Sequence, residues 1–222
     1  MDILTGLALA ASLMASQATT PAPAAPLDVA VTDARGRPVA DAIVTVEARG
    51  SAGRPARVSP AKAPSTHVID QAGLVFLPYL QVFRPGDRVV FRNSDRTQHH
   101  VYSFSQAKAF EFVLKPGESS TPLVLDQVGV ISAGCNIHDA MITYLFVTDA
   151  PWVERTPASG RVRLQDLPAG RFSVRVWHPR LRPGRTALPR EIEINGKPRQ
   201  LAFALTLLPD PRRRADPERP GY

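Results

Sequence analysis

Short apolar runs that alternate with polar residues recur along this chain, and glycine or proline separates most of them. Residues 171–176 read RFSVRV and residues 201–207 read LAFALTL, so an apolar side chain returns at every second position. This period of two is typical of half-buried strands. The chain holds 22 prolines and 14 glycines, and we find no convincing helical period after its first segment. We therefore expect an all-β protein.

The N-terminus begins with an apolar segment, residues 3–14, that is too short to span a bilayer comfortably. Small residues follow at positions 16 and 18, which is typical of a signal-peptide cleavage site. We predict that residues 1–18 are a signal peptide for export to the periplasm and that residues 19–26 are a flexible spacer. Asp2 stands where a basic residue is usual, so a core helix or a weak anchor is the alternative. No later run reaches 18 apolar residues, and we expect no transmembrane segment in the mature chain.

The net charge is +7 and the isoelectric point is about 10.2. Most arginines are spread singly along strand-like segments, and the one cluster, Arg212–Arg214, falls in a basic tail at residues 209–222. No basic stretch interleaved with aromatic residues suggests nucleic acid as a partner. An acidic protein or an anionic surface fits the charge equally well.

The most informative motif is GCNIHDAM at residues 134–141. Cys135 is the only cysteine, His138 follows three positions later, and Met141, one of three methionines, follows three after that. Cys135 could be a small buried hydrophobic residue. A lone cysteine in an exported protein is nevertheless a free thiol to be explained, and a metal-bound thiolate would explain it.

The available side chains restrict which metal could bind. Structural zinc usually takes several cysteines, a binuclear copper centre needs two, and haem attachment needs Cys-x-x-Cys-His. Cys135 and His138 could in principle form a nucleophile–base pair. They share one tight loop with Met141, however, which does not favour catalysis, and we find no other catalytic motif. A single cysteine thus disfavours structural zinc and excludes a binuclear copper centre, and the haem-attachment sequence is absent.

Two further candidate ligands lie next to each other in a distant part of the chain. His99 and His100 are adjacent on a predicted strand, so their side chains point to opposite faces. His100 shares its face with the apolar Tyr102 and Phe104. If that face is buried, His100 is the better candidate for a ligand inside the protein. The remaining histidines, His67 and His178, are expected to be structural or solvated.

Residues 66–149 resemble the cupredoxins, the small blue-copper proteins related to plastocyanin and amicyanin. The resemblance rests on LVFLPYLQVFRPGDRVVFRN, the PGES turn at 116–119, VGVISAGC and the spacing within the 135–141 motif. In this family the strand ligand lies six residues after an asparagine and two before a valine, which matches Asn93, His99 and Val101. The resemblance therefore implies a Greek-key β-sandwich and favours His99 over His100.

The same resemblance implies a function. It predicts one type 1 copper per chain, bound by His99, Cys135, His138 and Met141, and one-electron transfer without enzymatic turnover. The partner would be a redox protein such as a cytochrome or a dehydrogenase. His138 would be the electron port, within an apolar contact rim shaped by Ile137, Ala140 and Met141.

The segments on either side resemble carboxypeptidase regulatory-like, transthyretin-related sandwiches. GRPVADAIVTV, residues 36–46, resembles their opening hairpin, and LQDLPAGRFSVRVWHP, residues 164–179, resembles a later one. This implies that residues 27–50 and 161–208 form two halves of one small sandwich, into which residues 66–149 are inserted. Residues 150–160 are expected to be a connector. The alternative is three loosely joined β-segments. Proteins of this layout are often described as methylamine-utilisation or plastocyanin-like proteins.

Overall fold

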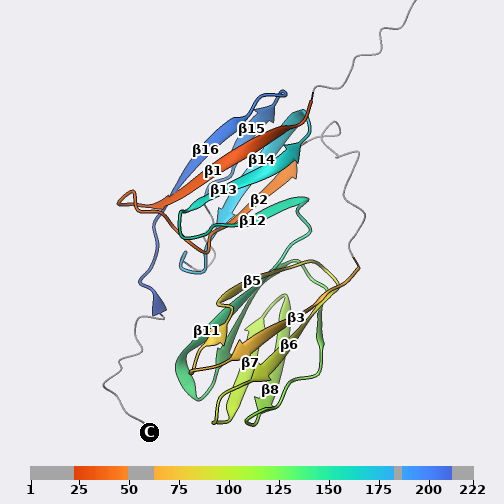
Figure 1. The fold of residues 1–222 in the computed structure, drawn as a ribbon, viewed down its shortest axis with the longest axis vertical. Coiled ribbons are helices and arrows are strands. Elements are labelled where there is room, and N and C mark those ends of the chain that lie inside the picture. Colours follow the sequence, from red (N-terminus) through yellow and green to blue (C-terminus); the bar gives the residue numbers. More distant parts are fainter. Residues whose placement is uncertain (1–22, 50–62, 183–186, 212–222) are drawn as a thin grey trace, which may run out of the picture.

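The fold is that of a computed structural model, which describes residues 23–49, 63–182 and 187–211 (Figure 1). These residues hold sixteen strands and no α-helix, so the predicted all-β class is confirmed. The predicted signal peptide at 1–18 and Arg212–Arg214 lie outside the described residues.

Two sheets are built from strands near both ends of the chain, and together they form what we call the split sandwich. One sheet consists of β13 (Arg161–Leu167), β1 (Ala25–Asp33) and β16 (Arg199–Leu205), in that order. The other consists of β12 (Trp152–Arg155), β2 (Ile43–Ala48), β14 (Gly170–Trp177) and β15 (Arg190–Ile194). The alternation predicted for β14 is present, because Phe172, Val174 and Val176 all face the shared core.

The two hairpins predicted in this sandwich are wrong in one respect. A tight turn does follow β1, where Gly36 adopts a positive φ of 76° and donates its backbone N–H to the carbonyl of Asp33. Beyond this turn, however, β2 lies in the opposite sheet, and β13 and β14 are divided in the same way. Both apolar runs of each pair must reach one core, and crossing between sheets lets them cover it from both sides.

The expected connector at 150–160 contains a strand that sequence reasoning missed. β12 pairs antiparallel with β2 along its whole length. The next residues are held by Thr156, whose hydroxyl donates to the carbonyl of Val39 (2.7 Å) and accepts the backbone N–H of Ala42 (2.9 Å). Thr156 is 1% exposed, so this polar pairing lies inside the sandwich and closes the passage from β1 to β2.

Two further sheets form the inserted sandwich, residues 66–147. The larger sheet has the order β5 (Leu80–Phe83), β11 (His138–Val147), β10 (Gly129–Cys135), β7 (His99–Ser105) and β8 (Lys108–Leu114). The smaller has the order β4 (Phe76–Leu77), β3 (Thr66–Gln71), β6 (Asp87–Asn93) and β9 (Leu123–Leu125). Apolar side chains from both sheets, among them Phe91, Ile131 and Leu145, are fully buried between them. Burial of each such side chain stabilises the fold by about 1.5–3 kcal/mol.

The two sandwiches touch through a small set of side chains. Trp177, at the end of β14, packs its ring against Tyr144 (5.9 Å between centroids) and Phe146 (5.3 Å) on the outer face of β11. Arg155 on β12 donates from Nη1 to the carbonyl of Leu80 at 2.7 Å. The two units in Figure 1 are therefore in side-chain contact and not merely joined by the chain.

Candidate metal centre

His99 opens β7 and points into the inserted sandwich. The alternation along this strand buries His99, Val101 and Ser103 and leaves His100 and Phe104 on the outer face. His99 is 0% exposed. A fully buried imidazole requires partners for both ring nitrogens, because an unpaired polar group in the interior is costly.

The loop between β6 and β7 supplies one of these partners. Asp95 Oδ2 lies 2.9 Å from His99 Nε2, and the Asp95 carboxylate also accepts the backbone N–H groups of Gly73 and Leu74. With Nε2 donating to Asp95, His99 presents the lone pair of Nδ1 to the interior. Sequence reasoning missed Asp95. The available signal was an acidic residue four positions before a candidate ligand.

Asp95 itself is placed by a buried amide. Asn93, the last residue of β6, is 0% exposed and donates from Nδ2 to the carbonyls of Thr97 (2.8 Å) and Leu114 (2.9 Å). Its Oδ1 accepts the backbone N–H of Asp95 at 3.0 Å. The asparagine therefore shapes the whole turn that leads into His99.

Burial and hydrogen bonding act in opposite directions on Asp95. Burial tends to raise the pKa of this carboxyl, but the hydrogen bonds from His99, Leu74 and Gly73 outweigh it and the pKa is lowered. Asp95 is therefore ionised at neutral pH and can hold the Nε2 proton of His99.

Cys135 and His138 face each other across the end of the β10–β11 ladder. They are opposite residues in the register, and only Asn136 and Ile137 turn between them. Cys135 Sγ lies 3.6 Å from His99 Nδ1 and 3.5 Å from His138 Nδ1. The two imidazole rings are 5.0 Å apart between centroids. The predicted ligands thus stand at strand ends and not on a long free loop.

These separations match those of ligand atoms that share one metal ion. Nitrogen and sulfur atoms bound about 2.0–2.3 Å from an ion, at trigonal or tetrahedral angles, lie about 3.5–3.8 Å apart. The ligand atoms of His99, Cys135 and His138 all lie within 4.8 Å of one another. Met141 is 2% exposed and belongs to the same buried cluster as Cys135.

The protonation of His138 also suits metal binding. Burial lowers the pKa of His138, the neighbouring His99 lowers it further, and Asp95 opposes the change. A lowered pKa keeps the imidazole neutral at pH 7, which leaves a nitrogen lone pair for a metal.

His100 takes no part in this cluster. Its ring points outward, with Nε2 lying 2.5 Å from Glu111 Oε1 and Nδ1 lying 3.4 Å from Asn136 Nδ2. His67 packs on the ring of Phe83 at 4.9 Å and lies 3.7 Å from an oxygen of Asp87. The geometry therefore favours His99 as the strand ligand.

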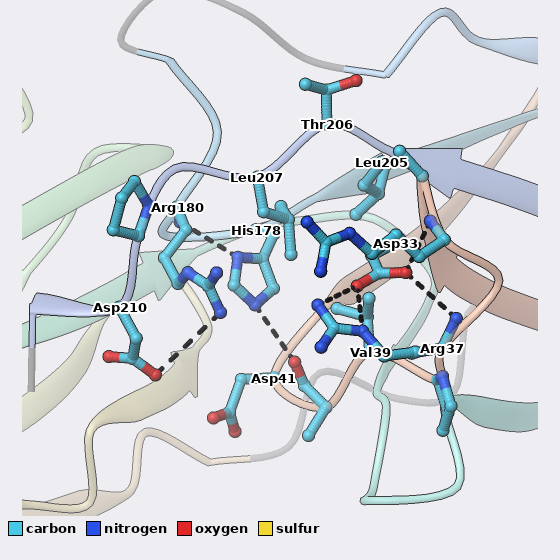
Figure 2. A pocket seen from close by; sticks show the side chains of 15 residues that line it. Asp33, Arg37, Val39, Asp41, His178, Arg180, Leu205, Thr206, Leu207 and Asp210 are labelled. Atoms are coloured by element: carbon cyan, nitrogen blue, oxygen red, sulfur yellow. Dashed lines mark hydrogen bonds and ion pairs between the residues drawn. The ribbon is translucent and has the colours of Figure 1, made fainter. Parts of the chain in front are cut away.

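His178 lines a separate pocket of ≈ 810 Å³ in the split sandwich (Figure 2). It is 3% exposed and accepts the backbone N–H of Arg180 at 3.0 Å. The same pocket carries the Asp33–Arg37 pair at 2.7 Å and Asp210, which lies 4.0 Å from Arg180. Asp33 and Asp210 each lie against an arginine there, and the other ring nitrogen of His178 lies 3.1 Å from the carbonyl of Ala40. Both ring nitrogens of His178 therefore have partners within the split sandwich, which is typical of a structural histidine.

The fold and the site together define an all-β protein of two sandwiches, in which the ligand atoms of His99, Cys135 and His138 lie close enough to share one metal ion and Met141 is buried in the same cluster as Cys135. A thiolate, two imidazoles and a thioether are the ligand types of a type 1 copper site. No helix within the described residues is long and apolar enough to cross a membrane.

Comparisons with known proteins give a resemblance only. The chain matches no protein-family model and no curated protein. Among solved structures it is similar to a copper-containing nitrite reductase from Thermus scotoductus SA-01, with 21% identity and a TM-score of 0.35, covering 39% of this chain and 22% of that one. The chain thus spans about a fifth of that reductase.

Two smaller proteins are also similar. Amicyanin from Paracoccus versutus has 16% identity and a TM-score of 0.34, with 47% of this chain and 98% of that chain covered. A purple cupredoxin from Nitrosopumilus maritimus has 19% identity and a TM-score of 0.32, with 38% and 99% covered. Such values establish neither a family nor an activity for this chain.

Proposed function

We propose that this protein carries single electrons on one copper ion bound by His99, Cys135, His138 and Met141. The observation that carries the proposal is the position of the lone thiol, which lies 3.5–3.6 Å from the Nδ1 atoms of two histidines in a buried site. Soft sulfur ligands with two imidazoles favour copper over the hard divalent cations. When bound, copper would supply a one-electron couple between Cu(I) and Cu(II).

The chain would contribute a site that changes little between the two oxidation states. β10 is hydrogen-bonded to both β7 and β11, so the strands that carry His99, Cys135 and His138 are neighbours in one sheet. Asp95 holds the ring of His99 from the far side. Ligands held this firmly limit the reorganisation that accompanies electron transfer.

The exposed end of the site suits contact with a second protein. His138 and Ala140 are partly exposed and Ile137 is 52% exposed, whereas Met141, which was expected in the rim, is 2% exposed and lies below it. We propose His138 as the electron port and this apolar rim as the contact surface for a redox partner such as a cytochrome or a dehydrogenase. The net charge of +7 favours an acidic partner. No substrate turnover is proposed for the chain alone.

Copper titration with visible spectroscopy tests this function. A copper–thiolate bond should give an intense visible band, and Cys135→Ser should abolish it while far-UV circular dichroism stays unchanged, because no other thiol can substitute. An intense band that survives in Cys135→Ser would refute the ligand assignment. A weak d–d spectrum in the wild type would indicate a copper buffer or chaperone, and no binding would indicate a structural sandwich that has lost its metal.

Export and domain identity are part of the proposal. We propose that residues 1–18 are removed on export to the periplasm, which the intact mass of protein from its native host would test. Retention of these residues would indicate an anchor or a different compartment. We also propose that residues 27–50 and 161–208 correspond to a regulatory-like sandwich around the copper unit at 66–149.

A further inference from the structure

The outer face of the five-stranded sheet is unusually apolar for a surface. Apart from His100, the outward positions of β7 and of the second half of β11 carry aromatic or aliphatic side chains, namely Tyr102, Phe104, Ile142, Tyr144 and Phe146. Monomeric proteins rarely expose continuous apolar patches of this kind unless they bind something there.

One half of this face is already covered. Tyr144 and Phe146 lie under Trp177 of the split sandwich, and their ring centroids are 5.9 and 5.3 Å, respectively, from that of Trp177. The other half, over β7 and β8, carries no such cover within the described residues. There Phe104 is 85% exposed and Val113 is 55% exposed, although both sit inside regular strands.

The uncovered half combines a protruding ring with a groove. A shallow groove of ≈ 370 Å³ is lined by Tyr102, Phe104 and Ile142, and β10 forms its floor with Gly134 and Ser132. Small floor residues keep it open. A Cβ on Gly134 would occupy the space beside Tyr102, in van der Waals contact 3.5 Å from its hydroxyl oxygen and 3.6 Å from its ring. Phe104 thus stands beside a groove that an aromatic side chain could fill.

This arrangement fits a second copy of the same chain better than an arbitrary partner. In a two-fold interface the same patch meets itself, so a ring beside a groove on one molecule finds a groove and a ring on the other. Charge agrees with this choice. The only side chains at the outward positions of β7, β8 and β10 that can carry a charge near neutral pH are those of His100 and Glu111, whose Nε2 and Oε1 atoms lie 2.5 Å apart. Two molecules of net charge +7 could meet here without like charges facing one another.

We propose that the protein forms a two-fold dimer through this face, with Phe104 of each copy seated in the groove of the other. The dimer is independent of copper, because none of its contacts is a proposed ligand. The dimer contacts would lie on β7 and β8, next to the part of the same face on β11 that Trp177 covers. The dimer interface would therefore continue the apolar contact between the two sandwiches.

Sedimentation velocity of the full mature chain over a range of concentrations tests the proposal. We expect the wild type to shift from one to two copies as concentration rises. Phe104→Asp should weaken self-association at least about tenfold, because a central aromatic anchor is replaced by a charge. Phe104→Ser is a milder second variant, and unchanged far-UV circular dichroism would show that each variant folds.

Leu188→Asp is the matched control. Leu188 is also 85% exposed, but it lies on the split sandwich in a pocket that it shares with Arg182 and Arg190. If two copies met through that pocket, the arginines of one copy would face those of the other and repel them. This variant should associate as the wild type does. A wild type that stays a single copy, or a folded Phe104→Asp variant that still pairs, would overturn the proposal. If the wild type is a single copy and Phe104→Asp instead impairs electron transfer to another protein, the face belongs to that partner.

Discussion

Replacing Asn93 by alanine should destabilise the inserted sandwich even without metal. The side chain is fully buried, and its amide makes three hydrogen bonds, to the carbonyls of Thr97 and Leu114 and from the backbone N–H of Asp95. The bond to Leu114 is buried, and the other two are partly buried. A buried group left unpaired costs about 1–3 kcal/mol, and each partly buried bond contributes less. We expect a total loss of about 2–4 kcal/mol in the free energy of unfolding.

Urea unfolding of the metal-free protein provides the assay. With an m-value of about 2 kcal/mol per molar urea, the midpoint should fall by about 1–2 M. Far-UV circular dichroism follows both sandwiches. Fluorescence follows the two tryptophans, Trp152 on Phe172 inside the split sandwich and Trp177 on Tyr144 and Phe146 of the inserted one. The loss should therefore appear in the dichroism transition and in the part of the fluorescence that comes from Trp177.

Ser94→Ala is the control for this prediction. Ser94 bonds to the exposed side of Asp70, where water can replace the lost partner, so its midpoint should move little. A loss below about 0.5 kcal/mol for Asn93→Ala, or equal losses for the two variants, would show that the amide does not hold the turn.

The ligand assignment predicts a ranking of copper affinity in which His99→Ala loses most, Met141→Ala mainly shifts the reduction potential, and His100→Ala keeps the visible spectrum. Copper titration gives this order, and a site destroyed by His100→Ala but spared by His99→Ala would reverse the assignment. The Asp70 carboxyl has a pKa below its usual 3.8, chiefly because Arg92 donates a hydrogen bond to it, while burial opposes the shift. Its contribution to stability is thus present above the unfolded-state pKa and is lost as pH falls through the lower folded-state pKa. Asp70→Asn should therefore flatten the acid limb of the stability curve, and an unchanged limb in acid titrations followed by circular dichroism would contradict this reasoning.

The strand content could be predicted from the period of two, but the buried side of a strand could not. In β7 the apolar Tyr102 and Phe104 lie on the outer face, while His99 lies inside. Apolar content alone would have assigned the wrong face of this strand to the core. Which face is buried depends on where the second sheet packs. The spacing from Asn93 to His99 was the better guide, since it reflects a turn that the asparagine amide holds together.

Contacts made by loops were the least predictable part of the site. Cys135, His138 and Met141 could be grouped from their spacing, but Asp95 could not be linked to His99 before the turn between β6 and β7 was known. The crossing from β1 to β2 was hidden for a similar reason. A period of two describes each strand and does not say which sheet the strand enters.

The position of β1 has a consequence for how the chain is made. β1 lies between β13 and β16, and the hydroxyl of Thr32 reaches the carbonyl of Phe203, 171 positions further along. At about 5–20 residues per second, a growing chain would take roughly 10–30 s to supply that partner. During this interval the inserted sandwich can close and β13 can pair with one edge of β1, whereas the edge that β16 later covers stays unpaired and open to misassociation.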